Sequence, residues 1–207
     1  GEIIWNSDEC KEAIKAMGTA SQLSPNFREA AAFMHFFAGR QISDANPEGA
    51  INEYIKSIQV CSDLAVVWNN MGLCYQRIER YEDAHNCLSG ALNLNPNDLF
   101  HCLNYSSICR WLERYDEGIQ YGKQAVSLYD PGIHDQALGA KAYFQLYINQ
   151  HLKGEAEGMN PIILKEAHDA IKNAYALNPN NEVYNTDLQM MNELQRSEEH
   201  TSELQSL

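Results

Sequence analysis

The clearest hydrophobic pattern in the chain lies just after residue 65. Met71 and Gly72 follow Trp68 by three and four positions, and Tyr75 follows them by four and three. Side chains at that spacing are neighbours on one face of an α-helix. The spacing therefore predicts an amphipathic helix that buries this face.

A second apolar face follows at once. Ala84, Leu88 and Ala91 are again spaced for one side of a helix, and Pro96 ends that helix because proline cannot continue it. Gly72 and Ala84 are small residues at the point where the first and second helices of this hairpin must approach closely. One hairpin cannot bury its apolar face alone, so the pattern predicts further hairpins stacked against it.

The same spacing recurs on both sides of this hairpin. The run RIERYEDA at 77–84 returns as WLERYDEG at 111–118, a shift of 34 residues. Upstream, residues 7–25 carry a second-helix pattern, and a first helix is expected over 26–41. Pro47 then stands where it can open the partner helix at its first turn, since the missing N–H costs little there.

Downstream, a first helix is expected over 134–150, followed by its partner and by a further helix over 182–195. Residues 150–162 are an insertion relative to the repeat spacing. They contain Gly154, Gly158 and Pro161, which indicates an exposed loop. The inward-facing positions of the last two helices are Ala167, Ile171, Ala174, Tyr184, Leu188 and Met191.

This arrangement resembles the tetratricopeptide repeat (TPR) family. Residues 65–98 fit the TPR spacing W-x2-L-G-x2-Y, A-x3-F, P, with Met for Leu and Leu for Phe. The following repeat departs from this pattern, with Cys102, Ser106 and Cys109 at the Trp, Gly and Tyr places. Cys102 and Cys109 are expected to be core residues, because they stand where the Trp and Tyr of the repeat belong. The resemblance covers about residues 7–195 and implies an all-α fold, a right-handed superhelix (an αα-solenoid) of about four repeats plus partial ends.

We expect residues 1–195 to form a single solenoid domain that is an internal fragment of a longer protein. The run RSEEHTSELQS at 196–206 resembles the translation of a sequencing adapter, so residues 196–207 are expected to be an artefactual tail. The expected repeats span approximately 7–25 (partial), 26–64, 65–98, 99–132, 133–181 and 182–195 (partial, or a cap).

In TPR proteins the first helices line a concave groove, and the resemblance implies that a partner binds there. Asn70 and Asn104 hold the same repeat place, where an amide can both donate to and accept from the backbone of a bound chain. Asn is also common at this place in TPRs that bind nothing known, so both interpretations stay open. The expected groove positions are Phe36, Asn69, Asn70, Leu73, Arg77, Phe100, Asn104, Arg110, Trp111, Tyr143 and Tyr147.

Large aromatic side chains and arginine on a concave surface are typical of binding hot spots. Trp111 is expected to project into the groove from the same helix as Phe100, and Phe100 either does the same or packs into the core between repeats. Arg77 and Arg110 could pair with carboxylates of a partner, or with acidic residues of their own surface such as Glu79 and Glu113.

One TPR chemistry is not expected. Cochaperones that hold the acidic C-terminal tails of heat-shock proteins use Lys, Asn and Arg on successive first helices. The matching places here are His35, Asn70, Phe100 and Asn104. Because the cations are missing, a C-terminal carboxylate is not the ligand that this resemblance implies.

Composition narrows the class of partner. The formal net charge of -13 argues against nucleic acid or an anionic membrane surface, and no apolar run approaches the roughly 18 residues of a membrane span. The six cysteines include no C-x-x-C pair, which indicates reduced thiols and a cytoplasmic location. The chain has no H-E-x-x-H, no nucleophile elbow and no Gly-rich phosphate loop, so we expect no catalytic residue, no cofactor and no metal.

We therefore expect a non-enzymatic scaffold or adaptor that binds a peptide or a partner helix in the groove, within a multisubunit complex. The WNNMGLCY run, followed by A-x-x-C-L, is also similar to the TPR subunits of the ciliary BBSome coat complex. The alternative is the substrate-recruiting TPR arm of a larger enzyme, such as a glycosyltransferase.

The expected tail gives a first prediction. Deleting residues 196–207 should leave the melting temperature within about 2 °C of the parent, because a chain of this size shifts by roughly 2–4 °C per kcal/mol and the tail has no place in the repeat spacing. Thermal unfolding followed by circular dichroism measures this. A drop well beyond that range would show that the tail belongs to the folded domain.

Overall fold

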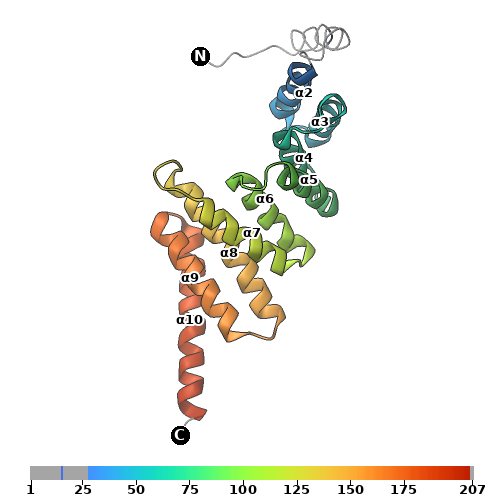
Figure 1. Ribbon diagram of the computed structural model, residues 1–207. Coiled ribbons are helices and arrows are strands. Elements are labelled where there is room, and N and C mark those ends of the chain that lie inside the picture. The colour runs from blue at the N-terminus through green and yellow to red at the C-terminus, as the bar shows by residue number, and fades with distance from the viewer. Residues whose placement is uncertain (1–14, 16–27, 206–207) are drawn as a thin grey trace. The chain divides into compact units, whose positions relative to one another are not determined.

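The computed structural model describes Lys15 and residues 28–205, and all of the elements in that part of the chain are helices (Figure 1). The described residues form successive helical hairpins, which confirms the predicted all-α solenoid of about four repeats. The second helix expected within 7–25 lies outside the described residues, except for Lys15.

The chain divides into two compact units, and the boundary lies between Pro96 and Asn97. The first unit contains two hairpins, whose helices are α2 (Arg28–Ile42), α3 (Pro47–Val60), α4 (Ala65–Arg77) and α5 (Tyr81–Leu94). The second contains α6 (Leu99–Cys109), the 3₁₀ turn η2 (Arg110–Leu112), α7 (Tyr115–Leu128), α8 (Gln136–Ala156), α9 (Pro161–Leu177) and α10 (Glu182–Gln205).

Polar side chains begin several of these helices. The side chains of Asn46, Asp98, Asp135 and Asn160 each accept a hydrogen bond from a backbone N–H in the first turn of the helix that follows, which satisfies a group that the helix cannot pair itself. Pro47 opens α3 at its first position, as predicted. Helix boundaries are thus set locally by the sequence.

Each unit has its own hydrophobic core between its hairpins. In the first unit the largest fully buried side chain is Tyr54, which packs with Phe36 across the α2–α3 hairpin, their ring centroids 6.0 Å apart. In the second unit Tyr147 and Ile171 join α8 to α9, and Tyr184 and Met191 bring in α10. Leu188 packs against the same core, so the three inward-facing positions predicted for α10 are confirmed.

Buried polar groups also hold the second unit together. Asn149, which is fully buried, donates from Nδ2 to the backbone oxygens of Ser106 on α6 and Gln145 on α8, each at 3.0 Å. The Ser106 hydroxyl donates to the Gly118 carbonyl of α7 at 2.7 Å. The serine that replaces the repeat glycine therefore links α6 to α7, and Asn149 links α6 to α8.

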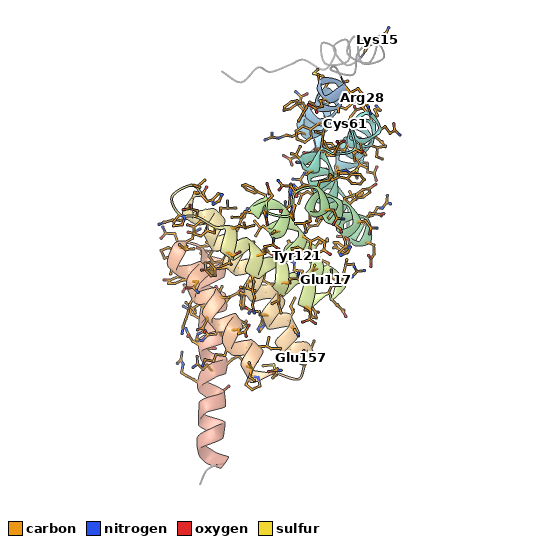
Figure 2. The ribbon with its side chains drawn as sticks, in the orientation of Figure 1. Lys15, Arg28, Cys61, Glu117, Tyr121 and Glu157 are labelled. Atoms are coloured by element: carbon orange, nitrogen blue, oxygen red, sulfur yellow. The ribbon has the colours of Figure 1, made fainter. Side chains whose placement is uncertain are left out.

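Tyr105 supplies a second link between α6 and α7. Its hydroxyl donates to Glu117 Oε2 at 2.6 Å, and its ring lies edge-on to that of Tyr121, with centroids 4.6 Å apart. Glu117 and Tyr121 both lie on α7 (Figure 2). Cys102 and Cys109 are fully buried beside these contacts, which confirms their predicted place in the core.

The prediction of an exposed loop over 150–162 is wrong for most of that range. Helix α8 continues through Ala156 and α9 begins at Pro161, so only residues 157–160 connect them. Gly154 lies inside α8, where an added Cβ would come within 2.7 Å of the Leu164 side chain. Its role is to admit the close approach of α9, and Gly158, with φ of 73°, makes the turn.

Gly72 carries a second prediction. A Cβ at this position would lie 2.7 Å from Leu88 Cγ and 3.2 Å from the Ala84 carbonyl oxygen, so Gly72→Ala should lower the free energy of unfolding by about 1–3 kcal/mol, and Gly72→Leu by more. Gly90 is the matched control, because its Cβ would meet Trp68 at an ordinary 3.4 Å. Gly90→Ala should be neutral or stabilise by up to about 1 kcal/mol.

Chemical denaturation of the three variants tests this. A Gly72→Ala variant as stable as Gly90→Ala would show that the two helices do not need a glycine where they cross.

Candidate functional site

The largest exposed aromatic side chains of the second unit lie on α6 and η2. Phe100 is 52% exposed and Trp111 is 50% exposed, although their neighbours Leu99, Cys102 and Cys109 are buried. Phe100 is therefore not packed in the core of its unit. We call Phe100, Asn104, Arg110 and Trp111 the α6–η2 surface.

Trp111 does not lie on the same α-helix as Phe100, which corrects the sequence-based expectation. Helix α6 ends at Cys109, and residues 110–112 form a 3₁₀ turn that ends at Glu113, with a left-handed φ of 56°. The tighter turn places the Arg110 guanidinium over the Trp111 ring, with Cζ 4.9 Å from the ring centroid. Such a contact contributes about 0.5–1 kcal/mol at an exposed site and so helps to hold the indole in place.

The polar side chains Asn70 and Arg77, at expected groove positions of α4, bond to other groups of the first unit. Asn70 Nδ2 donates to the Val66 carbonyl of its own helix at 2.7 Å. Arg77 donates to the Ser43 carbonyl at 2.9 Å and pairs with Asp44 at 2.8 Å. Of the two interpretations of Arg77, pairing with its own chain is thus the one observed, with Asp44 as the partner and not the nearby Glu79.

The remaining groove positions are less accessible. Phe36 and Tyr147 pack in the two cores, with 4% and 2% of their surface exposed. Asn69 is also buried, at 7% exposed. Leu73 and Tyr143 are partly buried, and Tyr143 packs against the core of the second unit.

A pocket that the repeat spacing did not predict lies between α9 and α10. It has a volume of about 260 Å³ and is lined by Pro161, Leu164, Lys165, His168, Met191, Leu194 and Gln195. His168 Nε2 and Asn192 Oδ1 lie 2.8 Å apart beside it. One signal for it was present in the sequence, because Leu194 follows the inward-facing Met191 by three positions and extends the apolar face of the last helix.

The buried cysteine thiols are poor nucleophiles at neutral pH. Burial raises the pKa of the Cys87 and Cys109 thiols to about 12 and that of Cys102 to about 11, which keeps them protonated at neutral pH. No group of three or more His, Cys, Asp or Glu side chains in the described part of the chain is placed to hold a metal ion. Within the same residues, no helix combines the length and apolar character needed to cross a membrane.

Comparison with known proteins supports the same fold. Residues 65–98 match the family model of the tetratricopeptide repeat. No curated protein sequence matches the chain. Because the family model covers one repeat, the likeness over the rest of the chain comes from solved structures.

Three solved structures illustrate this likeness. MamA from Desulfovibrio magneticus RS-1 has a TM-score of 0.67 at 17% identity, over 83% of this chain and 89% of its own. YrrB, described as a TPR protein with an unusual peptide-binding site, has a TM-score of 0.64 at 19% identity, over 88% and 85%. The first TPR of Spaghetti (RPAP3), bound to the HSP90 peptide SRMEEVD, has a TM-score of 0.53 at 19% identity, over 64% and 93%. The chain therefore has the TPR fold.

The buried thiols give a third prediction. At pH 8 a thiol with a pKa of about 12 is ionised in about one molecule in ten thousand, so iodoacetamide should modify the partly exposed Cys61 well before Cys87, Cys102 or Cys109. Peptide mass spectrometry over a time course measures this order, and unfolding in guanidinium should abolish it. Modification of Cys109 as early as Cys61 would contradict its place in the core.

Proposed function

We propose that this chain is a non-enzymatic interaction scaffold that binds a peptide or a helix of a partner protein, with the α6–η2 surface as its main anchor. The observation that carries the proposal is the pair of half-exposed aromatic side chains, Phe100 and Trp111. Exposed aromatic side chains of this size are costly in water, and they are enriched where proteins bind one another.

The magnitude of the effect fits a binding hot spot. An aromatic side chain buries roughly 150–250 Å² when fully covered, so covering the exposed half of Trp111 removes about 100 Å² from water. At about 25 cal/mol per Å² this contributes roughly 2–3 kcal/mol. Phe100 contributes a similar amount, so the two together can anchor a short segment.

Polar groups on the same surface suit a polypeptide ligand. Asn104 is only partly buried and lies on α6 between the two aromatic residues, where its amide can pair with the backbone of a bound chain. Arg110, stacked on Trp111, places a positive charge at one end of the surface. Asn70 already donates one amide N–H to the Val66 carbonyl within α4, so a bound chain would compete for that donor.

The structural neighbours support this class of function. YrrB carries a peptide-binding site and the first TPR of Spaghetti binds an HSP90 peptide, both on the fold seen here. The proposal does not extend to an acidic C-terminal tail, since the places that match the clamp of such cochaperones are His35, Asn70, Phe100 and Asn104. The proposal includes assembly within a multisubunit complex, which follows from the sequence-based resemblance of the WNNMGLCY run and stays a prediction.

The fourth prediction tests this surface. A library of displayed random 12-residue peptides is selected for binding to the full chain, and the affinities of the recovered peptides are measured by titration. Trp111→Ala should weaken their binding about tenfold or more, since truncation of a hot-spot residue costs about 2 kcal/mol, and Phe100→Ala should weaken it by a smaller factor. Ile133→Ala is the control, because Ile133 is 79% exposed but lies in the turn before α8.

The far-ultraviolet circular dichroism of each variant should match that of the parent. Peptides whose binding is unchanged by both aromatic substitutions would place the binding site elsewhere. Loss of helical signal in Trp111→Ala would assign Trp111 a packing role instead.

A further inference from the structure

The three first helices of the second unit, α6, α8 and α10, share one register. Each has a middle inward-facing residue that follows a buried residue by four positions and precedes another buried residue by three. These middle residues are Tyr105, Leu146 and Leu188. Because the helices repeat the same spacing, residues at a given distance from the middle residue lie on the same face of each helix.

The residue directly before the middle one is polar on all three helices. It is Asn104 on α6, Gln145 on α8 and Asp187 on α10, and each of these residues is partly exposed. Asn104 belongs to the α6–η2 surface, so Gln145 and Asp187 continue the same face across the second unit. We call Asn104, Gln145 and Asp187 the polar row.

The polar row crosses helices that lie next to one another. Helix α8 packs against α6, and the Phe144 ring of α8 lies 4.7 Å from the Tyr184 ring of α10, centroid to centroid (Figure 1). Helices α7 and α8 pack against α6, and α7 and α9 pack against α8, yet Asn104 and Gln145 stay partly exposed. Neighbouring helices of the repeat array thus leave this row accessible to a ligand.

Asp187 is the one charged member of the polar row. Burial raises the pKa of its carboxyl group, although the nearby His151 acts in the opposite direction. Within the described part of the chain, the carboxylate has no hydrogen bond or ion pair. Partial burial of a carboxylate without a partner costs free energy, so a cation that reaches this place supplies what the described fold does not.

A tyrosine hydroxyl lies close to the same carboxylate. Tyr147 is only 2% exposed, and its hydroxyl has no hydrogen-bond partner among the described residues. Burial raises the pKa of this hydroxyl, and the charges of Asp187 and Glu155 raise it further, so both carboxylates lie near it. A tyrosine oxygen can accept a hydrogen bond from a cation while its proton is donated to a carboxylate.

This arrangement suits the side chain of a lysine or an arginine. The second carboxylate, Glu155, has His151 Nε2 at 3.5 Å from its Oε1, and no described lysine or arginine pairs with it or with Asp187. An ammonium or guanidinium group binds through charge-assisted hydrogen bonds to one carboxylate and its neighbouring oxygen atoms. A metal ion would need a larger set of ligands than the described residues bring together.

We propose that the partner segment held by the α6–η2 surface also carries a lysine or an arginine, which pairs with Asp187 beside the Tyr147 hydroxyl. This inference rests on the proposed function and adds the charge of the ligand to it. Packed helices lie about 8–10 Å apart, so Asp187 is roughly 16–20 Å from Asn104, two helices away. An extended segment covers this distance in about five or six residues.

The experiment uses two libraries of displayed random 12-residue peptides, one without Lys and Arg and the other without Asp and Glu. Both are selected against the full chain, and the peptides whose binding Trp111→Ala weakens are retained. These should come mainly from the library that contains Lys and Arg. Asp187→Asn should weaken their binding about fivefold, because it removes the charge of the side chain and keeps its shape.

Glu193→Gln is the matched control for Asp187→Asn. Glu193 is an exposed carboxylate on the same helix, and its replacement changes the net charge by the same amount. It should change the affinity by less than about twofold, since only the general attraction of a cationic peptide to an acidic chain is reduced. Glutamate in place of the peptide's cation should weaken binding to the parent, and Asp187→Lys should restore part of it.

Thermal unfolding of Asp187→Asn separates a binding role from a structural one. Because no described residue pairs with the carboxylate, the melting temperature should be unchanged or higher. A lower melting temperature would show that Asp187 stabilises the fold, and it would overturn the assignment to a ligand.

Two further results would overturn this proposal and leave the proposed function intact. The first is a set of Trp111-dependent peptides with no preference for Lys or Arg. The second is binding that Asp187→Asn and Glu193→Gln reduce equally. If no recovered peptide depends on Trp111 or Phe100, the proposed function itself fails, and the pairing with Asp187 fails with it.

Discussion

The close crossing of paired helices is the constraint on which the structure depends. Backbone-to-side-chain approach of this kind needs a residue without a Cβ at the crossing point, and Gly72 against Leu88 meets that need in the first unit. In the second unit Gly118 lies against Asn149, and Gly154 against Leu164. Because hairpins pack at this distance, the apolar faces of their helices are buried between neighbours, and the exposed side chains lie on the faces that are turned away from those neighbours.

Local signals explain why much of the fold was predictable from sequence. Gly72, Ala84 and Pro96 mark a crossing and a helix end whose cause lies within one hairpin, and Pro47 begins α3 for a reason that is equally local. The extension of α8 was missed because Gly154 is compatible with a loop when read alone. Its role becomes visible only once Leu164, on the next helix, occupies the space a side chain would need.

The candidate sites were less predictable, and for a related reason. Repeat register placed Trp111 and Phe100 at exposed positions, but it assigned Phe36 and Tyr147 to the same surface although both pack in the cores. The partner of Arg77, Asp44, lies in a turn that register does not describe. The pocket between α9 and α10 also depends on how the two helices cross, and the apolar spacing within one helix predicts only one of its walls.

The hydrogen bonds of Asn149 have a consequence for how the second unit loses its structure. One amide group bonds to α6 and α8 while its side chain rests against Gly118 of α7. In a linear array of repeats, the end hairpins can unfold while the middle stays folded if the interactions between neighbouring repeats are weak. Separation of these three helices would break the Asn149 bonds and open its contact with Gly118 at the same time, so we expect α6, α7 and α8 to melt together as one cooperative unit.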